Sequence, residues 1–229
     1  VQDKRFKGME EQLRSGWGAL LKPLAWQGAL CYCPSSSSKA TFTHPASFLT
    51  NWNGLPDPAE AAPAVITRYL SAYGPATPET FDAWLSRNSN RKSTLRGWFA
   101  SLGEQVVEVR VEGETRYLLA EHEDELAATR PSRATHLLGA FDQFVLGPGT
   151  KDTHMLASEH RSLVSKAAGW IAPVLTRGGR ITGVWDMDDG NLVVTPFPGE
   201  QAPPSKVLED AAARLAAVHG SVKVAPRVD

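Results

Sequence analysis

The stretch that decides the fold is residues 64–120, which read AVITRYLSAYGPATPETFDAWLSRNSNRKSTLRGWFASLGEQVVEVRVEGETRYLLA. Its first apolar residues follow the i, i+3, i+4, i+7 spacing of an amphipathic helix: Ile66, Tyr69, Leu70 and Tyr73. A second apolar segment begins after Thr77, a residue type that favours helix N-termini. A third follows Asn90 and ends at Gly103. The spacing therefore predicts three short helices.

A two-stranded hairpin is predicted directly after these helices. Four valines between positions 106 and 111 favour a β-strand, and residues 112–114 form a turn before the chain returns through 117–119. Three short helices followed by such a hairpin is the winged helix-turn-helix pattern. We therefore expect residues 64–127 to be a winged-helix domain.

The rest of the chain is divided by proline and glycine. Residues 1–52 predict a helix near 9–26 and then a strand, a loop and a strand, which we interpret as the C-terminal part of a first winged-helix unit. Residues 53–63, rich in Pro, Gly and Ala, are interpreted as a linker. Residues 128–229 mix strands and helices and are expected to form a C-terminal β-rich α+β domain. The predicted fold class is therefore α+β.

The C-terminal part is expected to contain a strand-like segment, two helices and several further strands. Residues 136–146 are expected to be strand-like, residues 159–169 to form one helix, and residues 205–218 to form the last helix. Further strands are predicted around the Gly178-Gly179 turn.

The charges of the chain nearly cancel. Its 229 residues carry 24 Lys and Arg and 25 Asp and Glu, a net charge of −1, which excludes a histone-like polycation. The charges are nevertheless separated along the sequence. Residues 1–39 carry a net charge of +3, residues 86–100 carry +4, and residues 104–125 carry −6.

The basic third helix is the first candidate for DNA contact. Residues 86–100 hold four cations and no carboxylate, and Lys92 and Arg96 lie one helical turn apart on one face. A helix of this composition can reach the phosphates when it lies in the major groove. We expect these residues to contact double-stranded DNA: Arg87, Arg91, Lys92 and Arg96. A second group of expected contacts lies near the start of the chain: Lys4, Arg5, Lys7 and Arg14.

The acidic hairpin region argues against a second contact there. Eight acids against two arginines between positions 104 and 125 would be repelled by a phosphate backbone. Either this wing points away from DNA, or residues 104–125 contact a protein partner.

Other clusters of reactive residue types are weaker signals. Cys31 and Cys33 with His44 fall short of the four ligands of a structural zinc site. The group Asp152, His154, Ser158, His160 and Ser162 has no nucleophile motif around it, and we interpret its members as helix-surface residues. Because the cysteines and histidine are too few for a zinc site, we expect no metal. Because no phosphate-binding glycine loop is present, we expect no cofactor.

Asp142 and Gln143 interrupt an apolar run, and two interpretations remain open. They either cap or stabilise the end of a strand, or they belong to a site at the junction between domains. The absence of a long apolar segment and of a signal peptide, together with only two cysteines, favours a cytoplasmic protein. Because the first residue is Val, we also expect the chain to begin inside a longer protein.

Three segments together resemble one family. They are YLSAYGPAT with FDAW at 69–84, LLGAFDQFVLG at 137–147 and APVLTRGGRITGVW at 172–185. In order and spacing the chain is similar to the bacterial winged-helix DNA-binding family that includes the AlkZ and YcaQ type DNA glycosylases. The resemblance runs from about residue 9 to about residue 220.

The resemblance implies tandem winged helices around a DNA channel and a C-terminal β-rich domain. It also implies excision of alkylated bases or unhooking of crosslinks, through a Gln-x-Gln or Gln-x-Asp motif in the N-terminal winged helix. This sequence departs from the family there, because none of its six glutamines stands in such a motif: Gln2, Gln12, Gln27, Gln105, Gln143 and Gln201. No catalytic residue is therefore carried over.

Three hypotheses follow from the sequence. The leading one is a double-stranded DNA-binding protein with winged-helix modules. The alternative is a DNA glycosylase of the AlkZ or YcaQ type whose catalytic motif lies outside this chain. The third is a protein-interaction module that uses the acidic hairpin.

Overall fold

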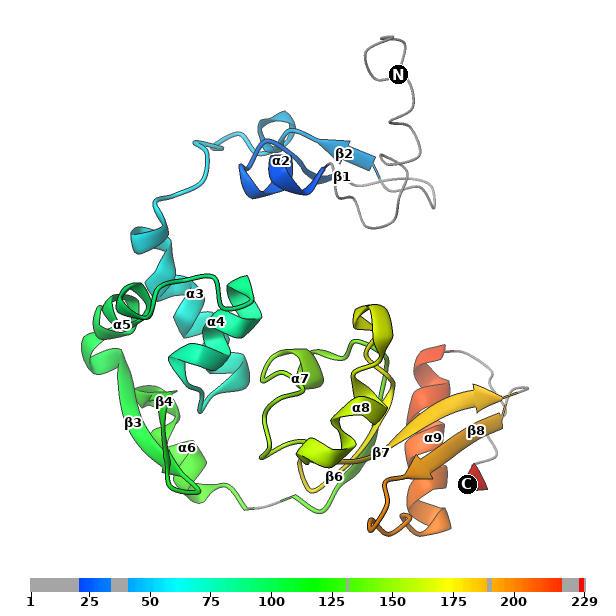
Figure 1. The fold of residues 1–229 in the computed structure, drawn as a ribbon. Helices are drawn as coiled ribbons and strands as arrows, with labels where there is room; N and C mark the ends of the chain where they lie inside the picture. Colours follow the sequence, from blue (N-terminus) through cyan, green and yellow to red (C-terminus); the bar gives the residue numbers. More distant parts are fainter. Residues whose placement is uncertain (1–20, 34–40, 131, 189–190, 220–226, 229) are drawn as a thin grey trace. The chain divides into compact units, whose positions relative to one another are not determined.

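The structure is a computed structural model that describes residues 21–33, 41–130, 132–188, 191–219 and 227–228. The chain forms two compact units, residues 1–61 and 62–229 (Figure 1). Helices and strands are mixed in both sequence and space, as the predicted α+β class requires.

The first unit contains a short helix followed by a hairpin. Its elements are α2 (Lys22–Trp26), β1 (Cys31–Cys33), β2 (Thr41–Thr43) and η2 (Pro45–Ser47), and β1 pairs antiparallel with β2. This order confirms the predicted helix followed by two strands for the described residues. The first part of the predicted helix lies outside them. That this unit belongs to a winged helix stays a prediction.

The predicted three helices and hairpin lie in the second unit, except for the first four residues of the first helix. These are α3 (Pro58–Tyr73), α4 (Pro78–Ser86), α5 (Lys92–Ala100), β3 (Val106–Val111) and β4 (Glu114–Leu119), with a 3₁₀ turn, η3 (Gly103–Gln105), before β3. Their core is apolar and aromatic, and Ile66, Tyr69 and Phe81 are at most 1% exposed. The order of elements predicted for residues 64–119 is therefore confirmed.

Two local contacts fix where α4 begins. Thr77 accepts a hydrogen bond from the backbone N–H of Thr80, while Thr80 Oγ1 accepts one from the backbone N–H of Thr77, which forms a capping box. Ala76, just before this cap, exchanges two backbone hydrogen bonds with Tyr117 of β4. The helix start is thus tied to the hairpin.

The predicted linker is wrong in its second half. Residues 58–63 are the first turns of α3, and Asp57 accepts a hydrogen bond from the backbone N–H of Ala59. Pro58 stands at the helix start, where a missing N–H removes no helical bond. Pro63 lies inside the helix, five residues after its start. Counting prolines as helix breakers led to the error.

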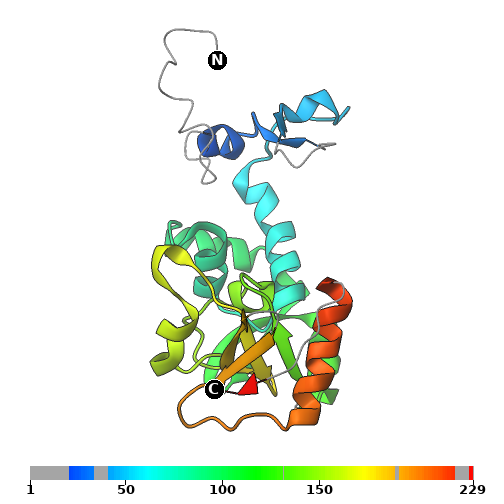
Figure 2. The same cartoon turned by 90° about the vertical axis from the view of Figure 1, so that its right-hand side faces the viewer.

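The remainder of the second unit holds a five-stranded sheet. Its strands are β5 (Thr135–Leu138), β6 (Val174–Arg177), β7 (Arg180–Asp188), β8 (Asn191–Pro196) and β9 (Arg227–Val228), in that order, and only the β8–β9 pair is parallel. Figure 2 shows α9 (Ser205–His219) running along one side of the sheet, and Leu208 of this helix is 2% exposed. This part is β-rich, as predicted.

Short helices replace parts of two predicted elements and add two elements that were not predicted. The expected strand over 136–146 ends at Leu138, and Asp142 caps α7 (Gln143–Leu146). The expected helix over 159–169 is broken into η5 (Ser158–His160), α8 (Arg161–Val164) and η6 (Ala167–Gly169). The acidic run after β4 forms η4 (Ala120–His122) and α6 (Glu123–Ala128), two elements that the sequence prediction did not include.

The helices of the second unit contact the C-terminal sheet region through α3. Tyr69 is 1% exposed, and its hydroxyl donates to the backbone oxygen of Gly147 at 3.1 Å. A Cβ at Gly147 would overlap the Tyr73 ring, so only glycine fits there. The hydroxyl of Tyr73 donates to Gln143 Oε1 at the exposed edge of the same contact.

We expect the buried Tyr69 hydrogen bond to stabilise this contact more than the exposed one. Tyr69→Phe should lower the free energy of unfolding by about 1 kcal/mol, because it leaves a buried carbonyl without its donor. Tyr73→Phe is the matched control and should have a smaller effect. Urea denaturation of both variants tests the difference, and equal effects would contradict it.

Candidate nucleic-acid interface

The turn between α4 and α5 is organised by a buried carboxylate. Asp82 is 2% exposed, and its Oδ1 accepts hydrogen bonds from the Ser86 hydroxyl at 2.5 Å and from Asn90 Nδ2 at 2.7 Å. Ser86 Oγ in turn accepts from the backbone N–H of Ser89 and from Asn90 Nδ2. The backbone oxygen of Asp82 accepts from the N–H groups of Arg87 and Asn88. This network sets the path of the turn.

The network also holds strained backbone. Arg87 and Asn88 have φ values of 58° and 63°, in the left-handed region that side chains other than glycine seldom adopt. Such conformations persist only where surrounding contacts enforce them. The backbone from which the exposed Arg87 side chain extends is therefore held in place.

The four predicted contact residues do not all lie on one helix. Arg87 and Arg91 belong to the turn, and Arg91 is the N-cap residue of α5, which starts at Lys92, close to the predicted start after Asn90. Lys92 and Arg96 lie on α5 as predicted. All four are exposed, and none makes an ion pair with another described residue. Leu95 and Phe99 of α5 are buried, and the exposed Lys92 and Arg96 lie beside this core face on the helix surface.

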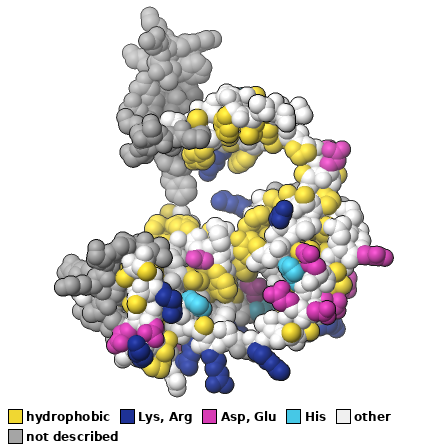
Figure 3. Space-filling view, turned by 180° about the vertical axis from the view of Figure 1, so that it is seen from behind, with side chains coloured by type: hydrophobic (Ala, Val, Ile, Leu, Met, Phe, Trp, Pro, Cys, Tyr) yellow, Lys and Arg dark blue, Asp and Glu magenta, His cyan; other side chains and the backbone are white. Residues whose placement is uncertain are grey.

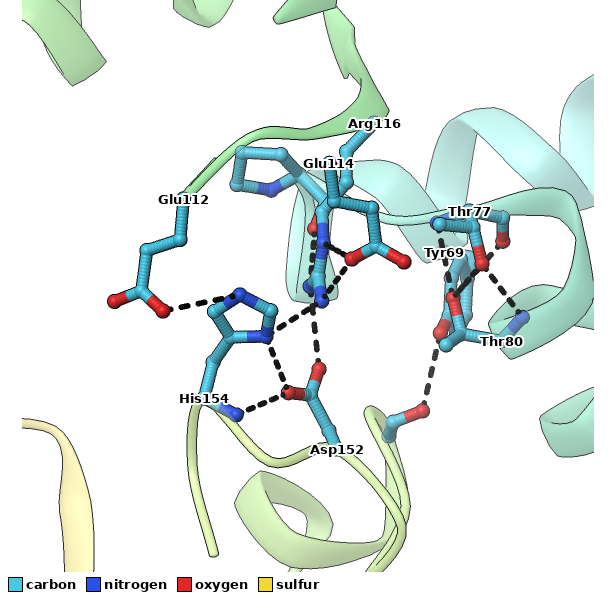
Figure 4. Close-up of polar contacts among 10 residues, drawn as sticks. Tyr69, Thr77, Thr80, Glu112, Glu114, Arg116, Asp152 and His154 are labelled. Carbon is cyan, nitrogen blue, oxygen red and sulfur yellow. Dashed lines mark hydrogen bonds and ion pairs between the residues drawn. The ribbon is translucent and has the colours of Figure 1, made fainter. Parts of the chain in front are cut away.

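The hairpin is held to the C-terminal sheet region by Arg116 (Figure 4). This residue of β4 is 9% exposed, and its Nη1 donates to Asp152 Oδ2 at 3.2 Å. Its Nε and Nη2 lie 2.9 and 2.8 Å from Glu114 Oε2. Nη1 also donates to the backbone oxygen of Pro75. The guanidinium thus joins three segments of the second unit.

His154 extends this cluster to the hairpin tip. Its Nδ1 lies 2.9 Å from Arg116 Nη2 and 3.1 Å from Asp152 Oδ1, and its Nε2 lies 3.4 Å from Glu112 Oε2. Because a guanidinium N–H can only donate, Nδ1 accepts from Arg116 when the imidazole is neutral and its proton is on Nε2. That proton then points to Glu112. The arrangement engages Glu112 and Glu114, two of the acids that made the wing unfavourable for DNA.

Hydrogen bonding controls the ionisation of the pair at the centre. Burial acts to raise the pKa of Asp152, but the backbone N–H of His154 and the Arg116 guanidinium together outweigh it and lower the pKa below its usual 3.8. Burial likewise acts to lower the pKa of Arg116, and the bonds to Glu114 and Asp152 raise it instead. Both groups are therefore charged in the folded protein.

A polar cleft lies beside this cluster. Its volume is about 630 Å³. The cleft is bordered by the α4–α5 turn, by the hairpin tip and by residues 148–154. Its charged lining residues are Glu79, Arg87, Glu112, Glu114, Arg116, Lys151, Asp152, His154 and Arg161. Figure 3 shows basic side chains along the lower edge of one face, acidic side chains mainly at its right, and both kinds together at the lower left.

Several sequence predictions are corrected by these contacts. Asp152 and His154 were expected on a helix surface, but Asp152 lies in a loop and its side chain is 6% exposed. Ser158 and Ser162 are exposed, as expected. Asp142 is a helix cap instead of a strand end, since its Oδ1 accepts from the backbone N–H of Phe144.

Part of the predicted interface cannot be placed. Lys4, Arg5, Lys7 and Arg14 lie outside the described residues. Within the described ranges, no group of three or more His, Cys, Asp or Glu side chains could hold a metal ion. Cys31 and Cys33 are free thiols. No helix among the described residues is long and apolar enough to cross a membrane.

Comparison with known proteins decides the family. The family model described as DNA glycosylase AlkZ-like matches residues 3–218. The chain belongs to the AlkZ-like DNA glycosylase family. The family resemblance found in the sequence is therefore confirmed.

A sequence comparison and a structure comparison show how far the likeness extends. The chain is 56% identical over all 229 residues to the interstrand DNA cross-link repair glycosylase of Streptomyces sahachiroi. The solved structure of Streptomyces sahachiroi DNA glycosylase AlkZ matches 99% of this chain with a TM-score of 0.90 and 55% identity. In both comparisons the chain spans 62% of the relative's length.

The Asp82 network yields a first prediction for this region. Asp82→Ala should lower the free energy of unfolding by about 1–3 kcal/mol, because it leaves buried hydrogen-bond donors unpaired. Asp82→Asn keeps an oxygen that can accept from Ser86 and Asn90, and should have a smaller effect. Urea denaturation midpoints measure both. Equal effects of the two substitutions would contradict the role given to the acceptor oxygen.

The lowered pKa of Asp152 predicts a pH dependence of stability. Because the pKa is lower in the folded chain, the carboxylate stabilises the fold at pH values above about 4, and this contribution is lost as the pH falls through the folded-state pKa. The stability difference between the wild-type chain and Asp152→Asn should therefore be constant from about pH 5 to 7 and shrink below about pH 4. Urea denaturation at each pH measures this difference. A difference that widens on acidification would contradict the assignment.

Proposed function

We propose that this chain is the DNA-binding part of a DNA glycosylase that acts on alkylated or crosslinked bases. The observation that carries the proposal is the exposed basic surface formed by the α4–α5 turn and α5. Membership of the AlkZ-like family supports DNA as the partner, and the cross-link repair activity named for the Streptomyces sahachiroi relative supports crosslinked DNA as the substrate.

The contact residues of the proposal are Arg87, Arg91, Lys92 and Arg96. Lys92 and Arg96 share one face of α5, and Arg87 and Arg91 continue the positive charge into the preceding turn. Phosphate contacts of this kind orient a protein on a duplex without reading its sequence. Lys4, Arg5, Lys7 and Arg14 are proposed as a second group of contacts.

The acidic hairpin is compatible with this proposal. Glu112 and Glu114 contact His154 and Arg116 within the second unit. The tip of the hairpin thus contacts the segment that carries His154, and the proposal does not place it in a DNA groove. DNA contact in this part of the chain is assigned to the basic turn and helix.

The base-excising chemistry is assigned to residues outside this chain. The motif that the family resemblance implies, Gln-x-Gln or Gln-x-Asp, does not occur in the 229 residues. Because the chain spans only 62% of the relative, the proposal places the chemistry in a part that the match does not cover. Within a complete enzyme, the residues described here would hold and orient the duplex.

The DNA-contact assignment predicts a change in the salt dependence of binding. Lys92→Glu combined with Arg96→Glu should weaken duplex binding and reduce the salt slope by about 0.9 for each phosphate that the variant no longer neutralises. The exposed pair Arg133→Glu and Arg177→Glu makes the same change in net charge and should leave the slope unchanged. Affinity measured against salt concentration tests both, and an unchanged slope in the Lys92/Arg96 variant would contradict the assignment.

The placement of the chemistry predicts which protein releases bases. This chain alone should release no base from duplexes carrying alkylated or crosslinked bases. A chimera that adds the unmatched part of the Streptomyces sahachiroi relative should release them. Release by the chain alone would overturn the placement. No release by a chimera that binds the duplexes normally would count against the glycosylase assignment.

A further inference from the structure

We propose that the cleft beside Arg116 binds a phosphodiester of the DNA backbone through Arg87, Lys151 and Arg161. This inference rests on the proposed function and extends its interface to residues 148–161, a segment in which the sequence predicts no DNA contact. The cleft lies between the α4–α5 turn and this C-terminal segment. One strand bound there would contact both parts of the second unit.

Three cations that line the cleft have no ion-pair partner among the described residues. The lining holds four carboxylates, of Glu79, Glu112, Glu114 and Asp152, and four basic side chains, so its charges balance when His154 is neutral. Glu112 contacts His154, while Glu114 and Asp152 contact Arg116. The remaining cations, Arg87, Lys151 and Arg161, make no ion pair with any other described residue. A phosphate bound beside them would supply the partner that they lack.

Each of the three cations stands on backbone that is held in place. Arg87 lies in the turn organised by Asp82, and its N–H donates to the Asp82 backbone oxygen. Lys151 immediately precedes Asp152, the partner of Arg116. Arg161 begins α8, and its backbone oxygen accepts from the N–H of Ser165 at 2.8 Å. Because the backbone is already ordered, binding an anion restricts the three side chains without the further cost of ordering the main chain.

The chemistry of the lining favours a phosphodiester. Arginine presents paired N–H donors that match phosphate oxygens, and lysine supplies a point charge. Neutral side chains that can donate hydrogen bonds also line the cleft: Asn88, Thr150 and Thr153. A cleft of about 630 Å³ that opens to the surface has room for a section of strand backbone. Arg116 also lines the cleft, but its guanidinium is already paired with Glu114 and Asp152, so the proposal assigns the anion contact to the other three cations.

Duplex binding by the full 229-residue chain tests the inference. Lys151→Gln combined with Arg161→Gln should reduce the salt slope by about one and weaken binding several-fold at low salt, as expected when one phosphate is no longer neutralised. Arg133→Gln combined with Arg177→Gln is the matched control, since it removes two exposed cations outside the cleft. Circular dichroism melting checks that each variant is folded.

The outcomes separate this inference from the proposed function. If wild-type chain binds duplex and the Lys92/Arg96 variant shows a reduced slope while the cleft variant does not, the cleft assignment is wrong and the proposed function stands. If wild-type chain binds no duplex at low salt, the proposed function itself fails. Inorganic phosphate provides a third arm. A rise in Tm with phosphate that is absent from the cleft variant, without any effect on duplex affinity, would overturn the DNA assignment in favour of a free anion.

Discussion

The ion pair between Arg116 and Asp152 is the constraint on which the second unit depends. The two side chains are 11% and 6% exposed, and Arg116 is the cation that pairs with the buried Asp152 carboxylate, while Arg116 itself also pairs with Glu114. A buried pair of this kind adds little net stability, because desolvation offsets most of its attraction. Its effect is instead to fix geometry, since it ties β4 to the loop that carries Asp152.

Several functional features follow from this geometry. The pair holds β4 against the loop that carries Lys151 and His154, and His154 in turn reaches the hairpin tip. Glu112 at the acidic tip therefore contacts His154 of the same unit. A second buried group, Asp82, independently shapes the α4–α5 turn. Two buried carboxylates thus hold the backbone beside cations that are proposed to bind DNA. Asp82 holds the turn that carries Arg87, and Asp152 holds the loop that carries Lys151.

The regular parts of this fold could be predicted from sequence because they obey local rules. The three helices and the hairpin followed from apolar spacing, from the Thr77 cap and from a run of valines. The family followed from three motifs in the right order. The basic residues of α5 were predicted from charge alone, although whether they contact DNA stays a prediction.

The remaining features depend on contacts between distant residues. Arg116 and Asp152 are 36 positions apart, and neither residue stands in a local pattern that signals its partner. Lys151 and Arg161 likewise stand in no sequence pattern that predicts a binding site. Residues 58–63 were mistaken for a linker, although prolines near a helix start are compatible with helix. A buried charged residue in the middle of a strand, such as Arg116, was the signal that could have indicated a partner elsewhere.

A double-mutant cycle on Arg116 and Asp152 tests the central claim most directly. The free energy of unfolding is measured for the wild-type chain, Arg116→Gln, Asp152→Asn and the double variant. We expect a coupling energy of about 1–3 kcal/mol, with the double variant less destabilised than the sum of the single variants. Additivity within about 0.5 kcal/mol would show that the two residues do not depend on each other, and would contradict the account.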